Sequence, residues 1–203
     1  MSETALTDRY DTASGLWADK MRVLGYYDGY LGFLSHRPGR ESAARVMDVG
    51  AGTGAMAEAW VAINGAPEAL TLLDPSAGML ARAQVALARR GVAVQLRAEG
   101  LGVSRVPPQD ALLAAHVIEH FADPLVALRL MAGALRPGGR LWLVVSKPHW
   151  CNAIIWLQWR HRTYTASRVA DMLEAAGLRL EAEYAFPAGP PSRTSRGYVA
   201  VRD

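Results

Sequence analysis

The sequence predicts an α/β fold built on a mostly parallel β-sheet with helices on both of its faces. Short apolar runs typical of buried strands alternate along the chain with longer segments of helical periodicity. This alternation indicates βαβ units, in which each connecting helix packs on a face of the sheet. The 203 residues are enough for one well-buried domain and few for two, so we expect a single domain over 1–203.

Residues 1–42 are predicted to form an N-terminal helical cap outside this alternation. Trp17, Met21 and Leu24 repeat at helical spacing, which indicates at least one amphipathic helix. Pro38 and Gly39 then break the pattern. We therefore expect one or two helices that end near this Pro-Gly pair.

The strands and helices of the sheet region follow one another closely. Strands are predicted at 44–50, 69–74, 92–98, 110–115, 140–146, 178–186 and 196–202. Helices are predicted at 55–64, 75–91, 123–135 and 165–177. Residues 136–139 (RPGG) are expected to form a turn, and 186–197 a loop. Because no helix is predicted between the last two strands, we pair them antiparallel at that edge of the sheet.

Composition excludes several classes of protein. The net charge is only +3 and no run of basic residues is longer than two, so we expect no nucleic-acid partner. No apolar run reaches the length of a membrane span, and the polar, acidic N-terminus does not resemble a signal peptide. Cys151 is the only cysteine, so no intramolecular disulfide is possible. A cytoplasmic location is therefore expected, while the oligomeric state is not predicted.

A glycine-rich loop follows the first predicted strand of the sheet. Gly50, Gly52 and Gly54 stand between that strand and a helix, where glycines let the backbone approach a ligand closely. The same spacing fits a dinucleotide-binding loop. Asp74 ends the next strand, twenty residues after Gly54, and can accept hydrogen bonds from two ribose hydroxyls. Both NAD and S-adenosylmethionine contain a ribose, so Asp74 does not distinguish between them.

Asp48 favours a cationic ligand over a dinucleotide. It lies near the end of an otherwise apolar strand, just before the first glycine of the loop. A carboxylate at this place would repel a pyrophosphate and attract an ammonium or sulfonium group. The alternative is that Asp48 only accepts hydrogen bonds from the amides of the loop.

With these motifs, residues 43–203 resemble the class I S-adenosylmethionine-dependent methyltransferases of the small-molecule type. Five segments match the motifs of that family in order: VMDVGAGTG, LTLLDPSAGML, LRAEG, DALLAAHVIEHFADP and LRPGGRLWLVVS. The resemblance implies a Rossmann-like sheet of seven strands, in which the last strand is inserted antiparallel. It also implies S-adenosylmethionine as cofactor and S-adenosylhomocysteine as product.

The resemblance implies a role for each motif residue. The three glycines would face the methionine part of the cofactor, near whose amino group Asp48 would lie, and Asp74 would bind the ribose. The remaining cofactor-binding candidates are Met79 near the adenine, His116 in the pocket wall, and Tyr10 on an N-terminal helix that closes over the cofactor. Glu99 stands where the family usually has Asp, so the amide of Gly100 or Leu101 is an alternative contact to the adenine.

His116, Glu119 and His120 also match the His-x-x-Glu-His spacing of one zinc-peptidase motif. A peptidase would place the triplet within a helix, whereas here it directly follows a buried strand. Some quinone-pathway O-methyltransferases carry Glu-x-x-Glu-His at this place and bind a divalent cation. In this chain His116 replaces the first carboxylate, and Mg²⁺ prefers oxygen ligands, so no metal is expected.

The candidate general bases are His116, Glu119, His120 and His149, of which the resemblance places His116 on the cofactor side. Methyl transfer needs a base only where the acceptor holds a proton at neutral pH. A direct role of His120 as base or acceptor contact competes with the alternative that Glu119 and His120 only orient their loop by hydrogen bonds.

Residues 148–164 are predicted to be an insertion on the acceptor side. Trp150 and Trp156 lie among several cationic residues there, which suits a flat or apolar acceptor with acidic groups. With Trp17 they are the candidate acceptor-binding residues, although packing of a lid or peripheral contact with a membrane surface would also explain them. The predicted function is methyl transfer to a small-molecule acceptor, with an aromatic or lipid-like acceptor favoured by the tryptophans alone. The alternatives are a nicotinamide-dependent oxidoreductase and a non-enzymatic binding protein of the same fold.

Overall fold

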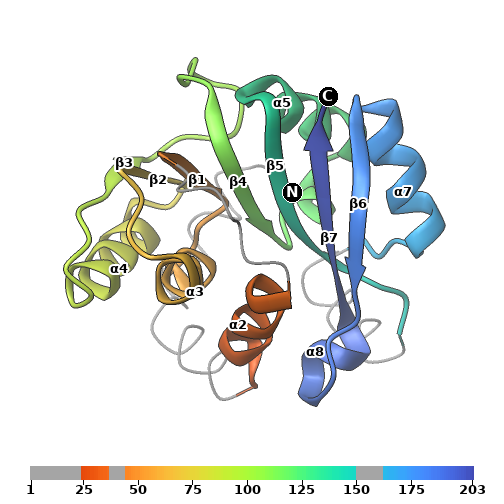
Figure 1. Ribbon diagram of the computed structural model, residues 1–203, viewed down its shortest axis with the longest axis horizontal. Coiled ribbons are helices and arrows are strands. Elements are labelled where there is room, and N and C mark those ends of the chain that lie inside the picture. Colours follow the sequence, from red (N-terminus) through yellow and green to blue (C-terminus); the bar gives the residue numbers. More distant parts are fainter. Residues whose placement is uncertain (1–23, 37–43, 150–161) are drawn as a thin grey trace.

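A computed structural model describes residues 24–36, 44–149 and 162–203. These residues form a seven-stranded sheet in the order β3-β2-β1-β4-β5-β7-β6 (Figure 1). β7 pairs antiparallel with both of its neighbours, whereas the other pairs are parallel. The strands are β1 (Arg45–Val49), β2 (Ala69–Leu73), β3 (Gln95–Arg97), β4 (Gln109–Ala115), β5 (Leu135–Ser146), β6 (Leu178–Tyr184) and β7 (Ser195–Arg202). The predicted α/β fold, with its antiparallel last strand inserted into the sheet, is confirmed.

Helices cover both faces of this sheet. The described helices are α2 (Tyr26–His36), α3 (Ala55–Asn64), α4 (Ala77–Ala88), the short 3-10 helix η1 (Ile118–His120), α5 (Pro124–Ala134), α7 (Ala166–Ala175) and α8 (Gly189–Thr194). Buried side chains of α2, α3 and α4 form one core cluster, and those of α5, α7 and η1 form the other. Successive residues of β4 alternate between the two clusters, since Leu113 joins the first and Leu112 the second.

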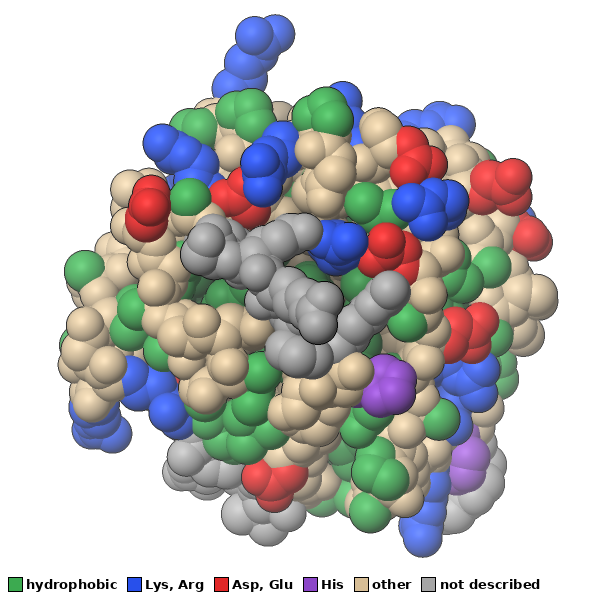
Figure 2. All heavy atoms as spheres, in the orientation of Figure 1, with side chains coloured by type: hydrophobic (Ala, Val, Ile, Leu, Met, Phe, Trp, Pro, Cys, Tyr) green, Lys and Arg blue, Asp and Glu red, His purple; other side chains and the backbone are tan. Residues whose placement is uncertain are grey.

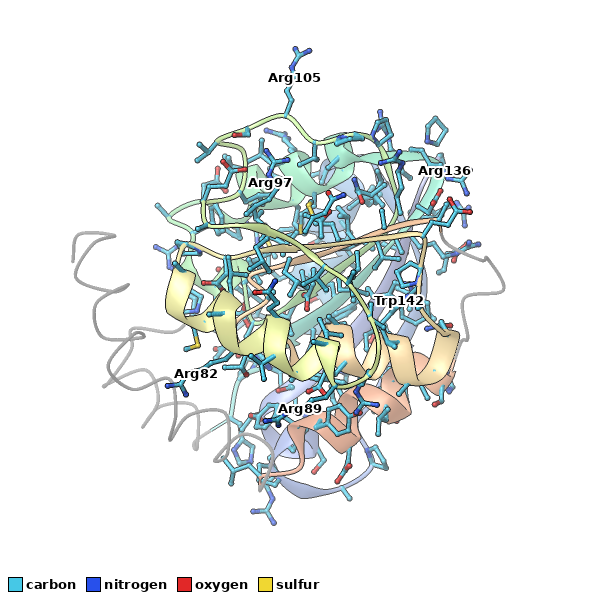
Figure 3. All side chains as sticks on the ribbon, turned by 90° about the vertical axis from the view of Figure 1, so that its left-hand side faces the viewer. Arg82, Arg89, Arg97, Arg105, Arg136 and Trp142 are labelled. Carbon is cyan, nitrogen blue, oxygen red and sulfur yellow. The ribbon has the colours of Figure 1, made fainter. Side chains whose placement is uncertain are left out.

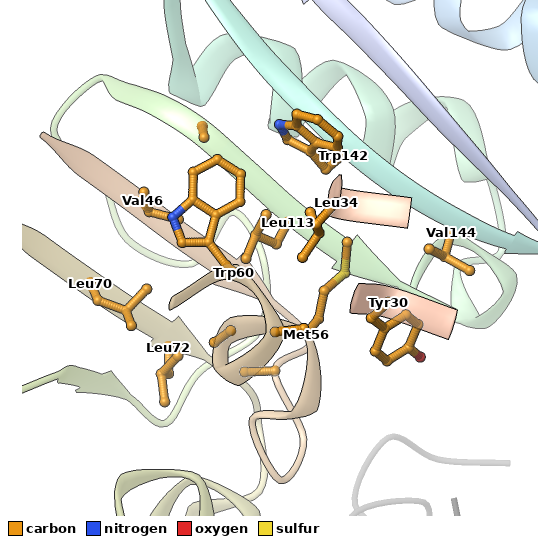
Figure 4. Close-up of a cluster of buried hydrophobic side chains, with 14 of the residues drawn as sticks. Tyr30, Leu34, Val46, Met56, Trp60, Leu70, Leu72, Leu113, Trp142 and Val144 are labelled. Atoms are coloured by element: carbon orange, nitrogen blue, oxygen red, sulfur yellow. The ribbon is translucent and has the colours of Figure 1, made fainter. Parts of the chain in front are cut away.

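Aromatic side chains hold α2 and α3 against the same strand. Trp142 of β5 meets Trp60 of α3 edge to face, with ring centroids 5.9 Å apart (Figure 4). Phe33 of α2 packs on the same Trp142 ring at 5.5 Å. Such pairs contribute about 0.5–1.5 kcal/mol each beyond the burial of their area. These two aromatic pairs therefore fix α2 on the same face of the sheet as α3 and α4, near the carboxyl ends of the parallel strands.

Two segments depart from the sequence prediction. Residues 186–197, expected as a loop, contain the six-residue helix α8, in which Thr194 Oγ1 donates to the carbonyl of Pro190 at 2.9 Å. The expected turn at 136–139 lies within β5 instead. Gln109 of β4 pairs with Leu135, and Ala111 pairs with Arg140. Residues 136–139 therefore form an irregularity in the pairing of β4 with β5. β3 is also shorter than the predicted 92–98.

Arginine side chains are spread over several elements of the described surface. Figure 3 shows Arg82 on α4, Arg89 directly after that helix, Arg97 at β3 and Arg105 projecting away from the molecule. On the face shown in Figure 2, acidic and basic side chains are interspersed. Within the described ranges, no helix is long and apolar enough to cross a membrane.

Candidate active site

The three loop glycines have two different structural roles. All adopt positive φ, at 63° for Gly50, 52° for Gly52 and 86° for Gly54. A Cβ on Gly50 would come within 2.6 Å of a Val117 methyl group, and one on Gly54 within 2.9 Å of the Ala83 Cβ. A Cβ on Gly52 would meet no atom of the described chain within 4 Å. Gly50 and Gly54 therefore permit close packing, whereas Gly52 faces open space in which a ligand can approach the backbone.

Asp74 joins this loop to the turn after β2. One carboxylate oxygen accepts from the Gly52 amide and the other from the Ser76 amide, both at 2.9 Å. Each carboxylate oxygen can accept more than one hydrogen bond, and these two contacts orient the Asp74 side chain. The carboxylate lies beside the Gly52 backbone, and its binding of a ribose stays a prediction.

Asp48 is almost completely buried beneath the loop. Its Oδ2 accepts from the Ala57 amide in the first turn of α3 at 3.1 Å. Burial raises the pKa of Asp48 to about 8, assisted by the nearby charge of Asp74 and opposed by the Ala57 hydrogen bond. The hydrogen bond agrees with the capping alternative. The raised pKa shows that the ionised carboxylate is unfavourable in this environment, and a cation near Asp48 would stabilise it.

The residues predicted near the adenine lie after β2 and β3. Met79 is buried in the first turn of α4, where its amide donates to Ser76 Oγ at 3.1 Å. The Glu99 carboxylate is engaged by Arg97 Nε at 2.8 Å and by Ser104 Oγ at 2.7 Å. These contacts hold the Glu99 carboxylate against its own loop. The alternative contact, from the Gly100 or Leu101 amide to the adenine, stays a prediction.

His116 ends β4 in an unusual backbone conformation. Its φ of 58° makes it the one described residue other than glycine with positive φ. Such a conformation costs about 1–3 kcal/mol and persists only where the surroundings enforce it. The Nδ1 atom lies 3.3 Å from Glu119 Oε1 and 3.0 Å from Ser146 Oγ, and the Nε2 atom lies 3.4 Å from Ser195 Oγ. Four elements therefore meet at this ring.

Glu119 and His120 lie in η1 but face different surroundings. Glu119 is buried, and its Oε1 accepts from the Ser146 amide at 2.7 Å. The His120 side chain is exposed, but desolvation by the surrounding protein lowers its pKa. The charge of Glu119 opposes this shift, and the charge of His116 adds to it. His149 is partly buried three residues after β5. No group of three or more His, Cys, Asp or Glu side chains among the described residues is arranged to bind a metal ion.

Four of the predicted site residues, Tyr10, Trp17, Trp150 and Trp156, lie outside the described residues, as does most of the proposed insertion at 148–164. The structure instead adds Tyr26 and Tyr30 of α2. Tyr30 is buried, and burial raises its pKa, with smaller contributions from Tyr26, Asp48 and Glu119. Their spacing of four residues on one helical face was the available signal.

Comparison with known proteins agrees with this architecture. Residues 47–141, from β1 into β5, match the family model described as "Methyltransferase domain". This region is a methyltransferase domain of the class I S-adenosylmethionine-dependent type. The family resemblance found in the motifs is thus confirmed. The matched region contains the glycine loop, Asp74, His116 and Glu119.

Relatives and solved structures share different parts of the chain. A ubiquinone biosynthesis O-methyltransferase of Xanthomonas axonopodis pv. citri is 30% identical over 105 residues, or 50% of this chain and 43% of that protein. The chain spans only 30–43% of the first curated relatives that it matches. The structure of the mitomycin 7-O-methyltransferase MmcR aligns with TM-score 0.78 at 22% identity, covering all of this chain and 61% of that one. Magnesium protoporphyrin IX methyltransferase from Synechocystis, solved with S-adenosylhomocysteine, aligns over both entire chains with TM-score 0.74 at 14% identity. The structural likenesses show a shared fold.

Proposed function

We propose that this protein transfers a methyl group from S-adenosylmethionine to a small-molecule acceptor. The observation that carries the proposal is the juxtaposition of Gly52 and Asp74, joined by a 2.9 Å hydrogen bond beside open space, with the buried Asp48 beneath the same loop. This set offers a carboxylate for a ribose diol, a glycine backbone for close approach and a second carboxylate for a cation. A cation beside Asp48 stabilises the ionised carboxylate, whereas a pyrophosphate would hold Asp48 protonated and gain no ion pair, which disfavours a nicotinamide dinucleotide.

The bound cofactor would supply an activated methyl group, so the protein mainly has to position the acceptor in line and exclude water. Asp74 would orient the ribose, and Asp48 would neutralise the ammonium of the methionine part. Acceptors named for similar proteins, a ubiquinone precursor, a mitomycin and a magnesium porphyrin, are largely flat ring systems. They support an aromatic acceptor here, in agreement with the tryptophan-rich segment.

Purified protein should gain thermal stability from S-adenosylhomocysteine and none from NADH. A ligand at about one hundred times its Kd stabilises the folded state by about 2.7 kcal/mol, which raises the Tm by several degrees. Differential scanning fluorimetry measures this shift. Asp74→Asn should reduce it, whereas Asp203→Asn, at the exposed C-terminus, should keep it. Stabilisation by NADH alone would contradict the proposal.

His120 is proposed as the base or acceptor contact. Because its pKa is lowered, its ring is neutral at neutral pH and can accept a proton, an ability that is lost as the pH falls. A screen with labelled cofactor, run with and without chelator, identifies the acceptor. With that acceptor, His120→Ala should lower kcat by at least about a hundredfold if His120 is the base. His36→Ala, at the end of α2, should keep wild-type turnover. Unchanged turnover in His120→Ala would assign His120 a structural role, and loss of activity with chelator would indicate a metal.

A further inference from the structure

Both ring nitrogens of His116 are engaged inside the protein. On one side, Nδ1 faces Glu119 Oε1 at 3.3 Å and Ser146 Oγ at 3.0 Å. A carboxylate can only accept a hydrogen bond, and the same Oε1 already accepts from the Ser146 amide at 2.7 Å. A hydrogen bond from His116 to Glu119 therefore requires the hydrogen on Nδ1, and the Ser146 hydroxyl, which can donate or accept, is compatible with that tautomer.

The other side of the ring leads to α2. Nε2 faces Ser195 Oγ at 3.4 Å, and Ser195 Oγ lies 3.3 Å from Thr194 Oγ1. The Thr194 hydroxyl in turn lies 2.9 Å from the Tyr26 hydroxyl. In the tautomer with the hydrogen on Nδ1, Nε2 accepts from the Ser195 hydroxyl, and since the Thr194 hydroxyl donates to the Pro190 carbonyl, the link from Ser195 to Thr194 runs through the backbone between these consecutive residues. The Tyr26 ring also meets the imidazole edge to face, with centroids 5.8 Å apart.

These contacts connect the two sides of the proposed active site. α2 also carries Tyr30, whose pKa responds to both Asp48 on the cofactor side and Glu119 on the acceptor side. Beyond Glu119, η1 ends with His120. His116 is thus the junction between the helix over the cofactor side and the turn that bears the candidate base.

We propose that His116 is a positioning residue for methyl transfer. Through Nδ1 it holds Glu119 and with it the turn 117–120, and through Nε2 it holds Ser195, whose neighbour in the chain, Thr194, bonds Tyr26 of α2. It acts on the acceptor side through the turn that bears His120, without itself taking the acceptor's proton. This inference rests on the proposed function, since only that function gives the two sides a shared reaction.

The tautomer and the coupling are tested first, without an acceptor. In protein with ¹⁵N-labelled histidine, we expect His116 to show a protonated Nδ1 and an unprotonated Nε2, with its signals assigned by their loss in His116→Asn. Ser195→Ala should shift the Nε2 signal. Ser195→Ala and Tyr26→Phe, which lie across the ring from η1, should both speed amide hydrogen exchange at 117–121. Thr71→Val, which removes a buried hydroxyl from β2 far from the ring, should change neither readout.

Activity with the acceptor from the screen completes the test. His116→Gln removes the donor at the Nδ1 position and should lower kcat/KM for the acceptor by about tenfold to a hundredfold, as misplacement of reacting groups does. His116→Asn keeps a donor at that position and tolerates positive φ, so it should restore part of this loss. Affinity for S-adenosylhomocysteine, measured by calorimetry, should fall less in both variants than kcat/KM for the acceptor does in His116→Gln, because His120 contributes only on the acceptor side.

The opposite tautomer, or unchanged exchange at 117–121 in both Ser195→Ala and Tyr26→Phe, would overturn the proposal. So would wild-type kcat/KM in His116→Gln. Failure of the proposed function has a different signature, because wild-type protein would then not bind S-adenosylhomocysteine while the tautomer and exchange results stand unaffected.

Discussion

Asp48→Asn will bind S-adenosylhomocysteine more weakly than wild type but will be the more stable protein at alkaline pH. Asparagine has nearly the same shape and its carbonyl oxygen can still accept from the Ala57 amide, so the start of α3 is preserved. What the variant loses is a carboxylate able to pair with the ammonium of the ligand. Loss of one charged hydrogen bond is expected to weaken binding by about tenfold to a hundredfold.

The gain in stability follows from the pKa of Asp48, which is about 8 in the folded protein and 3.8 as the ordinary value. Between these values the folded state keeps a proton that the unfolded chain has released. The free energy of unfolding of the wild type therefore falls as the pH rises through this window, by at most about 1.4 kcal/mol per pH unit from this group. Asparagine does not titrate, so this contribution to the slope vanishes.

Urea denaturation between pH 5 and pH 8.5 measures the slope, and calorimetry measures the affinity. Asp171→Asn, an exposed position on α7, should behave as wild type in both experiments. Calorimetry of the wild type below pH 8 in buffers of different ionisation enthalpy should also detect a proton released on binding, since the ligand's cation lowers the pKa of Asp48. Wild-type affinity in Asp48→Asn would leave Asp48 with the helix-capping role that its sequence position also allowed.

Local sequence signals predicted those helices and strands whose two ends are marked by residues within or next to the segment. α3 begins and ends where predicted because glycines at 54 and 65 flank its apolar periodicity. α8 was missed because Pro190 and Pro191 in a glycine-containing stretch indicate a loop, although proline is well tolerated in the first turn of a helix. The placement of β7 between β5 and β6 followed from the family resemblance, since pairing over such distances leaves little trace in local periodicity.

The candidate site divides in the same way. The glycine loop and the two acidic residues stand directly at strand ends, so their positions could be predicted from the sequence. The partners of His116 could not, because Ser195 is 79 residues away along the chain, and Tyr26 and Thr194 are 168 residues apart. The positive φ of His116 could not be predicted either, because glycine and asparagine are the residues that usually indicate such a conformation.

Alanine at three glycines should separate the packing and binding roles of the loop. Gly52→Ala should lose about 1–2 kcal/mol of stability, the cost of left-handed backbone for a residue with a Cβ. Gly65→Ala should lose about 1–3 kcal/mol, because φ 84° and ψ 176° lie in a region that is almost exclusive to glycine. In both, the new methyl group meets no atom of the described chain within 4 Å. Gly50→Ala bears the same backbone cost as Gly52→Ala and also drives a Cβ to 2.6 Å from Val117, for a total of about 2–5 kcal/mol.

Binding should follow a different order. Gly65 lies at the end of α3, so Gly65→Ala should bind S-adenosylhomocysteine as wild type does, and it is the control for backbone strain outside the loop. Gly52→Ala places its methyl group in the space assigned to the ligand, beside the Asp74 carboxylate, and should lose most of its affinity while remaining folded. Urea denaturation and calorimetry on the three variants measure the two properties independently. Equal affinity in Gly52→Ala and Gly65→Ala would show that the open space above Gly52 is not where the ligand binds, and would remove the observation on which the proposed function depends.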